Sequence, residues 1–220
     1  MSLANDSVLV TPGTGATVAT HLVSSKEHQV IMLADYSGHL HGTLESYLYA
    51  TPTVAVGASK LYFDLFNATG SGKVIDVRGI WIIPATDVAL TGALGVRYDL
   101  YRTSAVGTGG TAAPYKSATP DVAGGNINPF DTDNATLPAQ ITARWLPTGG
   151  ATIANWLFAT YAPGEETATS MAHITQYQNI IPVLNIGQKL TIRENSGILM
   201  KQGTVAATGN TKFLVAFTTE

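Results

Sequence analysis

The sequence predicts an all-β protein folded as one sandwich domain. Apolar and polar residues alternate with a period of two in several segments, which is the pattern of strands. Turn-forming runs such as 195–197 and 208–210 follow or separate such segments, and helical periodicity is weak. A chain of 220 residues is also a common length for a single all-β sandwich.

The N-terminal region is expected to contain an extended arm and a hairpin. Residues 1–15 show no period and include Thr11-Pro12-Gly13-Thr14-Gly15, so we interpret them as the arm. Residues 16–23 and 28–34 then fit two strands joined across 24–27. The whole of 16–220, this hairpin included, is expected to form the sandwich domain.

Three alternating segments predict long strands in the first half of the sandwich. One face of each carries, in turn, Leu61, Phe63 and Leu65; Ile75, Val77, Trp81 and Ile83; and Val96, Tyr98 and Leu100. The opposite faces of the second and third strands carry Asp76, Arg78, Arg97 and Asp99. If these two strands are neighbours, the four side chains form a cross-strand charge ladder.

Residues 103–139 are expected to form a long inserted loop. They are rich in Gly, Ala, Thr, Pro and Asn and carry few charges, so we expect them to be ordered against a neighbouring subunit. Residues 153–159 fit a helix or a strand equally, and we interpret them as a strand, while 168–171 fit one helical turn.

The C-terminal quarter predicts three further strands. Residues 189–194 and 198–202 are expected to pair across Asn195-Ser196-Gly197. The last strand is 212–218, in which Phe213, Val215 and Phe217 share a face.

The chain is short of charge, which indicates a subunit of a larger assembly. Only 12% of its residues are charged, about half the share of a typical soluble domain, while 45% are hydrophobic. No apolar run approaches the ~18 residues of a membrane span. A surface with so little charge is expected to face other protein chains.

Charge and cysteine content exclude several classes of function. The net charge of −3 and the scattered basic residues argue against nucleic-acid binding. Without cysteine there can be no disulfide, zinc–thiolate site or thiol catalysis. The first residues lack the pattern of a signal peptide, so synthesis in a cytoplasm is expected.

Two motifs resemble ligand loops but fail in detail. Gly70-Ser71-Gly72-Lys73 looks like the end of a phosphate-binding loop, but Val74 follows where Ser or Thr is needed. Asp131-Thr132-Asp133-Asn134 looks like the start of a calcium loop, but position six is Thr136 and position twelve is Thr142. A turn is the favoured interpretation of both.

Histidines and tyrosines offer the remaining site candidates. His39 and His41 could bind a metal with His21, His28 and Asp35, but polar loop residues are the favoured interpretation, so no metal site is assigned. Tyrosines that could line a sugar-binding face are instead expected to pack within the sheets: Tyr47, Tyr49, Tyr62, Tyr98 and Tyr101. No catalytic residues are assigned, because no Ser nucleophile pairs with a base and the acids are scattered.

Two stretches resemble structural proteins of tailed bacteriophages. The first is VLVTPGTGATVAT over 8–20, followed by HQVIMLAD over 28–35. The second is LTIRENSGILMKQ over 190–202, which is similar to the closing strands of phage virion proteins of β-sandwich type. The resemblance implies a jelly-roll-like β-sandwich and a virion component, with a capsid decoration (cement) protein as the expected kind.

We therefore expect a non-enzymatic subunit that stabilises a phage head by bridging major capsid proteins. The expected partners are the major capsid protein and further copies of the chain, with a trimer favoured by the resemblance; no cofactor, nucleic acid or membrane is expected. The expected location is the virion, after synthesis in the host cytoplasm. The arm and the inserted loop supply the interface candidates Val8, Val10, Pro12, Ile127, Pro129 and Phe130.

Two other functions stay open at this point. The first is a phage tail, fibre or baseplate protein that binds a host-surface glycan through exposed aromatic residues. The second is a glycan hydrolase, which would need two carboxylates about 5–10 Å apart across one cleft. It ranks last because no such pair stands out in the sequence.

Overall fold

The computed structural model describes residues 18–23, 26–31, 33–34, 40–41, 44–85, 96–119, 123–132, 134–149, 151–162, 178–181, 190–207 and 209–220. The chain divides into two compact units, Met1–Leu44 and Glu45–Glu220. None of the described residues belongs to a helix long and apolar enough to cross a membrane.

The first unit contains two short antiparallel pairs. β1 (Val18–Val23) pairs with β2 (Lys26–Ile31), which confirms the predicted hairpin, and β3 (Leu33–Ala34) pairs with β4 (Leu40–His41). Neither pair joins the sheets of the second unit. The sandwich therefore begins at Glu45 and not at residue 16, because alternation identifies a strand without identifying its sheet. The predicted arm, 1–15, lies outside the described residues.

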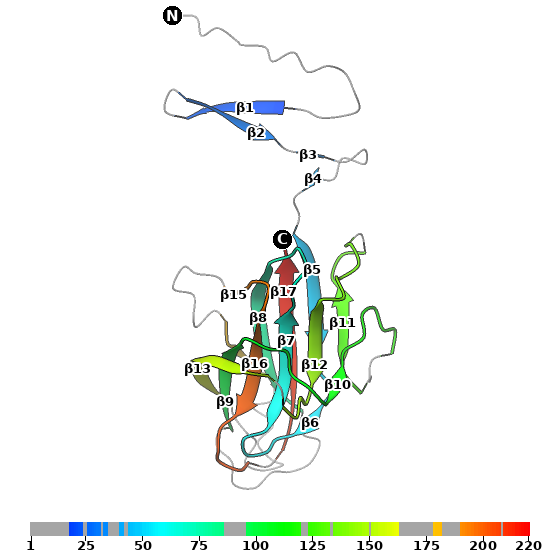
Figure 1. Cartoon of the computed structure of the whole chain (residues 1–220), viewed down its shortest axis with the longest axis vertical. Coiled ribbons are helices and arrows are strands. Elements are labelled where there is room, and N and C mark those ends of the chain that lie inside the picture. The colour runs from blue at the N-terminus through cyan, green and yellow to red at the C-terminus, as the bar shows by residue number, and fades with distance from the viewer. Residues whose placement is uncertain are drawn as a thin grey trace, which may run out of the picture. The chain divides into compact units, whose positions relative to one another are not determined.

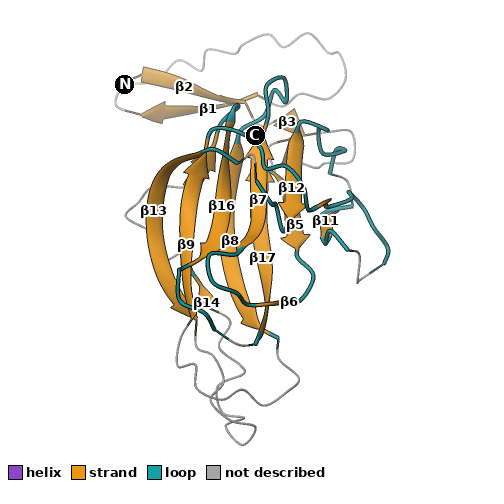
Figure 2. Cartoon of the chain, turned by 60° about the horizontal axis from the view of Figure 1, so that its bottom comes forward, coloured by secondary structure: helices purple, strands orange, loops and turns teal. Residues whose placement is uncertain are grey.

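The second unit is a sandwich of two antiparallel sheets, and no helix occurs among its described residues (Figures 1 and 2). The β17 sheet has the order β11-β5-β17-β8-β14, with β15 on β8 and β6 on β17. Its strands are β5 (Glu45–Ala50), β6 (Val54–Ala55), β8 (Ile75–Pro84), β11 (Asn126–Pro129), β14 (Gln178–Asn179), β15 (Leu190–Ile192) and β17 (Asn210–Thr219).

The β16 sheet has the order β10-β12-β7-β16-β9-β13. Its strands are β7 (Leu61–Asn67), β9 (Val96–Thr103), β10 (Thr111–Ala112), β12 (Ile141–Trp145), β13 (Ile153–Ala162) and β16 (Ser196–Gln202). The strands predicted around 60–66, 95–102, 153–159 and 198–202 are thus confirmed. The expected pairing of 198–202 with 189–194 is wrong, because β15 pairs with β8 in the other sheet. The turn proposed at 168–171 lies outside the described residues.

The strand order is that of a jelly roll. Counted along the chain, the main strands are β5, β7, β8, β9, β13, β14 with β15, β16 and β17. The first, eighth, third and sixth strands are β5, β17, β8 and β14 with β15, and they lie side by side in the β17 sheet. The second, seventh, fourth and fifth strands are β7, β16, β9 and β13, and they lie side by side in the β16 sheet. This interleaving of eight strands between two sheets is the jelly-roll topology.

The predicted inserted loop is only partly a loop. The segment between β9 and β13 contributes β10, β11 and β12, which extend both sheets on the same side of the sandwich (Figure 1). Two of these strands fall within 103–139, where a simple loop was expected. β10 has two residues and β11 has four, which is too few to show a period of two. The sequence pattern therefore missed both strands.

A bulge in β8 changes the predicted face of two residues. Phe217 pairs with Val77, but Ala216 pairs with Gly79, so Arg78 is an extra residue on β8. Ile80 and Ile82 consequently enter the core, while Trp81 and Ile83 are turned to the outer face of the β17 sheet. The prediction that Trp81 and Ile83 share a face with Ile75 and Val77 is therefore wrong.

Gly79 leaves room for the Trp81 side chain, which the bulge turns outward. A Cβ at this position would lie 2.4 Å from the Trp81 ring. We expect Gly79→Ala to push the ring aside and to lower the free energy of unfolding by about 1–3 kcal/mol in a urea titration. Gly57→Ala is the matched control, because its nearest contact would be an ordinary 3.5 Å. Equal stability of the two variants would contradict this reading of the bulge.

The core lies between the sheets and contains four of the five tyrosines considered above. Tyr47, Tyr49, Tyr62 and Tyr98 are buried, which confirms the packing interpretation for them. Burial raises the pKa of Tyr98 to about 12. The predicted charge ladder is wrong, because β8 and β9 belong to different sheets.

Candidate functional site

The outer face of the β17 sheet carries an apolar groove. It has a volume of about 430 Å³ and is lined by Leu48, Trp81, Ile83, Phe130 and Leu214. These residues come from β5, β8, β17 and the turn after β11. We call this feature the apolar groove.

Strand register explains why these side chains meet. Leu214 on β17 is the cross-strand partner of Trp81, and Ala216 is the partner of Leu48. Cross-strand partners point to the same face of a sheet. Phe130 follows β11, where its backbone N–H donates to Ser46 O at 2.9 Å, and its side chain is 63% exposed. None of the described residues that line the groove is charged.

The groove includes one of the predicted interface residues and excludes another. Phe130 forms a wall of the groove, as just described. Ile127 is only 2% exposed and packs in the core, so it presents no surface to a partner. Pro129 is half-buried on β11, and Val8, Val10 and Pro12 lie outside the described residues. The bulge in β8 explains why alternation did not predict the position of Trp81 and Ile83 in the groove.

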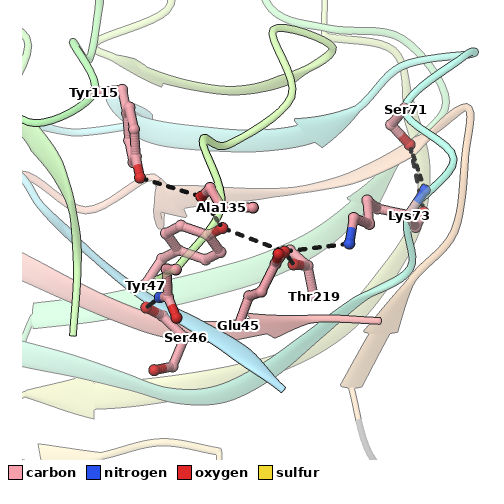
Figure 3. A network of polar contacts seen from close by, with 9 residues as sticks. Glu45, Ser46, Tyr47, Ser71, Lys73, Tyr115, Ala135 and Thr219 are labelled. Atoms are coloured by element: carbon pink, nitrogen blue, oxygen red, sulfur yellow. Dashed lines mark hydrogen bonds and ion pairs between the residues drawn. The ribbon is translucent and has the colours of Figure 1, made fainter. Parts of the chain in front are cut away.

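The start of β5 is held by a polar network (Figure 3). Glu45 accepts a hydrogen bond from Thr219 Oγ1 at 2.8 Å and lies 3.2 Å from Lys73 Nζ. Burial alone would raise the pKa of Glu45, but the hydrogen bonds from Thr219 and Lys73 and the charge of Lys73 lower it overall. The hydroxyls of Tyr47 and Tyr115 donate to Ala135 O at 3.0 and 3.3 Å. The network fixes the first residue of the sandwich and is structural.

The loop 70–73, which resembles a phosphate-binding loop, binds the carboxylate of Glu194 from the same chain. Gly70 and Gly72 adopt φ of 85° and 64°, and the Gly72 N–H donates to Glu194 Oε1 at 2.8 Å. Hydrogen bonds from Gly72 and Gly70 lower the pKa of Glu194. A carboxylate therefore fills the position that a phosphate would take, which agrees with the turn interpretation.

The proposed histidine cluster lies largely beyond what the structure describes. His21 and His28 are register partners in the β1–β2 hairpin, and His41 lies in β4. His39 and Asp35 fall outside the described residues. Over the part of the chain that the structure describes, no three His, Asp or Glu side chains are placed to hold a metal ion.

Comparison with known proteins identifies no relative. No protein-family model, no curated protein and no solved structure matches the chain.

Proposed function

We propose that this protein is a non-enzymatic structural subunit of a bacteriophage particle, and that its apolar groove packs against a second copy of the chain. A capsid decoration protein that bridges major capsid proteins is the role that we favour. The observation that carries the proposal is a groove lined by five apolar side chains on the outside of the sandwich.

Composition and fold support this proposal. Exposed apolar patches generally mark interaction sites, and the centres of protein interfaces are depleted of charged residues. Here the whole chain has 12% charged residues. Jelly-roll domains are common in viral capsids, although they also occur in lectins and enzymes, so the fold supports the proposal only by analogy.

The shape of the groove favours a second copy as its occupant. Phe130 is a protruding aromatic side chain, while Trp81 and Leu214 line the adjoining hollow on the same face. Because the projection and the hollow belong to one surface patch, two copies can pack this patch on itself about a twofold axis.

A charge placed in the groove should separate the copies. We expect Leu214→Asp to lower the mass in sedimentation velocity from that of an oligomer to that of a monomer, because the buried carboxylate would have no partner. Phe130→Asp should do the same, and it lies in a turn where the sheet is not disturbed. Val205→Asp, at a site that is 78% exposed outside the groove lining, is the control. An unchanged mass for folded Phe130→Asp would overturn the proposal.

Catalysis is not part of the proposal, because several described carboxylates are already engaged. Glu45 is held by Thr219 and Lys73, and Glu194 by the backbone of Gly72. The glycan-binding alternative loses the four tyrosines that are buried in the core.

A further inference from the structure

We propose that the outer face of the β16 sheet, where β9 and β13 pair, binds an oligosaccharide. The surface consists of Trp156 and Tyr161 on β13 and of Arg97, Asp99 and Tyr101 on β9. We call it the aromatic surface. It is independent of the apolar groove, which lies on the other sheet.

Register places these five side chains on one face. Tyr161 pairs with Arg97, Ala159 with Asp99, and Trp156 with Tyr101. A bulge between Trp156 and Phe158 shifts the alternation of β13, so that Trp156 and Tyr161 share a face although they are five positions apart. Because their partners are four residues apart on β9, the two rings are spaced by about 13 Å along the strand. That spacing suits a chain of sugar rings better than a single ring.

Both aromatic rings are more exposed than packing requires. Trp156 is 53% exposed and Tyr161 is 62% exposed. Tryptophan is highly buried on average in folded proteins. The Trp156 side chain is nevertheless held in place, because its Nε1–H donates to Asp99 Oδ1 at 2.9 Å. A fixed indole ring with solvent-accessible surface is preorganised for stacking.

Asp99 and Arg97 provide the polar part of the surface. Arg97 donates to Asp99 Oδ1 from Nε at 3.1 Å and from Nη2 at 2.8 Å. All the described hydrogen bonds to the Asp99 side chain end on Oδ1. No described donor reaches Oδ2. The Asp99 side chain as a whole is only 5% exposed. Arginine has five N–H groups, and the two used here leave three for other acceptors.

This combination matches the chemistry of a sugar. A pyranose ring has an apolar C–H face that can stack on an aromatic ring, and its edge carries neighbouring hydroxyls. One hydroxyl can donate to Asp99 Oδ2 while the next accepts from Arg97, and hydrogen bonds to charged groups are stronger than neutral ones. Lys201, the register partner of Asp99 on β16, adds a donor beside them.

The same charges make this surface a poor protein interface. A partner chain that covered Asp99 and Arg97 would have to satisfy the remaining acceptor and donor groups or leave them buried and unpaired. The apolar groove has no such requirement, since the described residues that line it are all apolar. The two outer faces of the sandwich thus differ in the partner that each suits.

The test is an NMR titration of the full chain with maltotriose, cellotriose and chitotriose as probes. The Nε1–H signal of Trp156 is assigned by its loss in Trp156→Phe. We expect at least one probe to shift this signal, and Trp156→Ala and Tyr161→Ala each to weaken its binding by roughly tenfold. Thr136→Ala, at an exposed site that belongs neither to the aromatic surface nor to the groove lining, should bind as the unaltered protein does.

Three results would overturn the proposal. The first is that none of the three probes shifts the Trp156 signal at the limit of solubility. The second is that folded Trp156→Ala and Tyr161→Ala bind as well as the unaltered chain. The third is that Trp156→Ala changes the mass of the oligomer while no probe binds, which would assign this surface to self-association.

Discussion

Replacing Phe213 by Ala is expected to destabilise the sandwich by about 3–5 kcal/mol, the usual loss for a buried aromatic side chain. Phe213 is fully buried on β17, and its ring centroid lies 5.1–5.5 Å from those of Tyr62, Phe63 and Tyr98. These three belong to β7 and β9 of the opposite sheet. The ring therefore joins the two sheets directly, and its removal leaves a cavity between them.

Urea unfolding measures this effect. The midpoint should fall sharply while the slope of the free energy with urea stays the same, because the surface exposed on unfolding hardly changes. Val205→Ala, at an exposed site, should leave the midpoint in place. A loss below about 1 kcal/mol for Phe213→Ala would show that the sheets are held together elsewhere.

The second large effect concerns Asp64 and its dependence on pH. Asp64 is fully buried on the outer side of β7, beneath a loop whose Gly107 N–H donates to Oδ2 at 2.5 Å. Oδ1 has no hydrogen-bond partner among the described residues. Burial raises the pKa of Asp64 from 3.8 to about 6, although the Gly107 bond and the charge of Arg144 act in the opposite direction.

A raised pKa means that the folded chain binds this proton more tightly than the unfolded chain. The stabilising contribution is therefore fully present below the unfolded pKa of 3.8, and it is lost as the pH rises through about 6. A shift of about two pKa units corresponds to roughly 3 kcal/mol. Asp64→Asn removes the titration but keeps an acceptor for Gly107.

The measurement is the free energy of unfolding of both proteins between pH 4 and pH 7.5. The unaltered protein should lose about 2 kcal/mol relative to Asp64→Asn across this range, since pH 4 already lies slightly above the unfolded pKa of 3.8. Other carboxylates, such as Glu45 and Glu194, are common to both proteins and cancel in the difference. Parallel profiles would show that Asp64 titrates as an ordinary carboxylate.

The sequence pattern identified the long strands because each keeps a period of two over many residues. Phe213, Val215 and Phe217 were expected on one face of the last strand, and all three are buried. The pattern failed where the backbone breaks the period. One extra residue at Arg78 turns Trp81 outward, so the apolar groove could not be predicted from alternation.

The aromatic surface was missed for a related reason. The segment around Trp156 fits a helix or a strand in sequence, and its bulge disguises which residues share a face. Alternation places Asp99 and Arg97 on one face of their strand and suggests a charge ladder with β8, which would require the two strands to be neighbours. Their actual neighbour, β13, follows more than 50 residues later in the chain, and β9 pairs with it across the edge of the β16 sheet.

The most direct test of the proposed function is to add the purified protein to phage shells assembled without it and to image them by cryo-electron microscopy. We predict density at fixed, symmetry-related positions, with the apolar groove of each copy covered by its neighbour. Shells that stay bare, or bound copies whose groove faces solvent, would contradict the proposal that this surface builds the assembly.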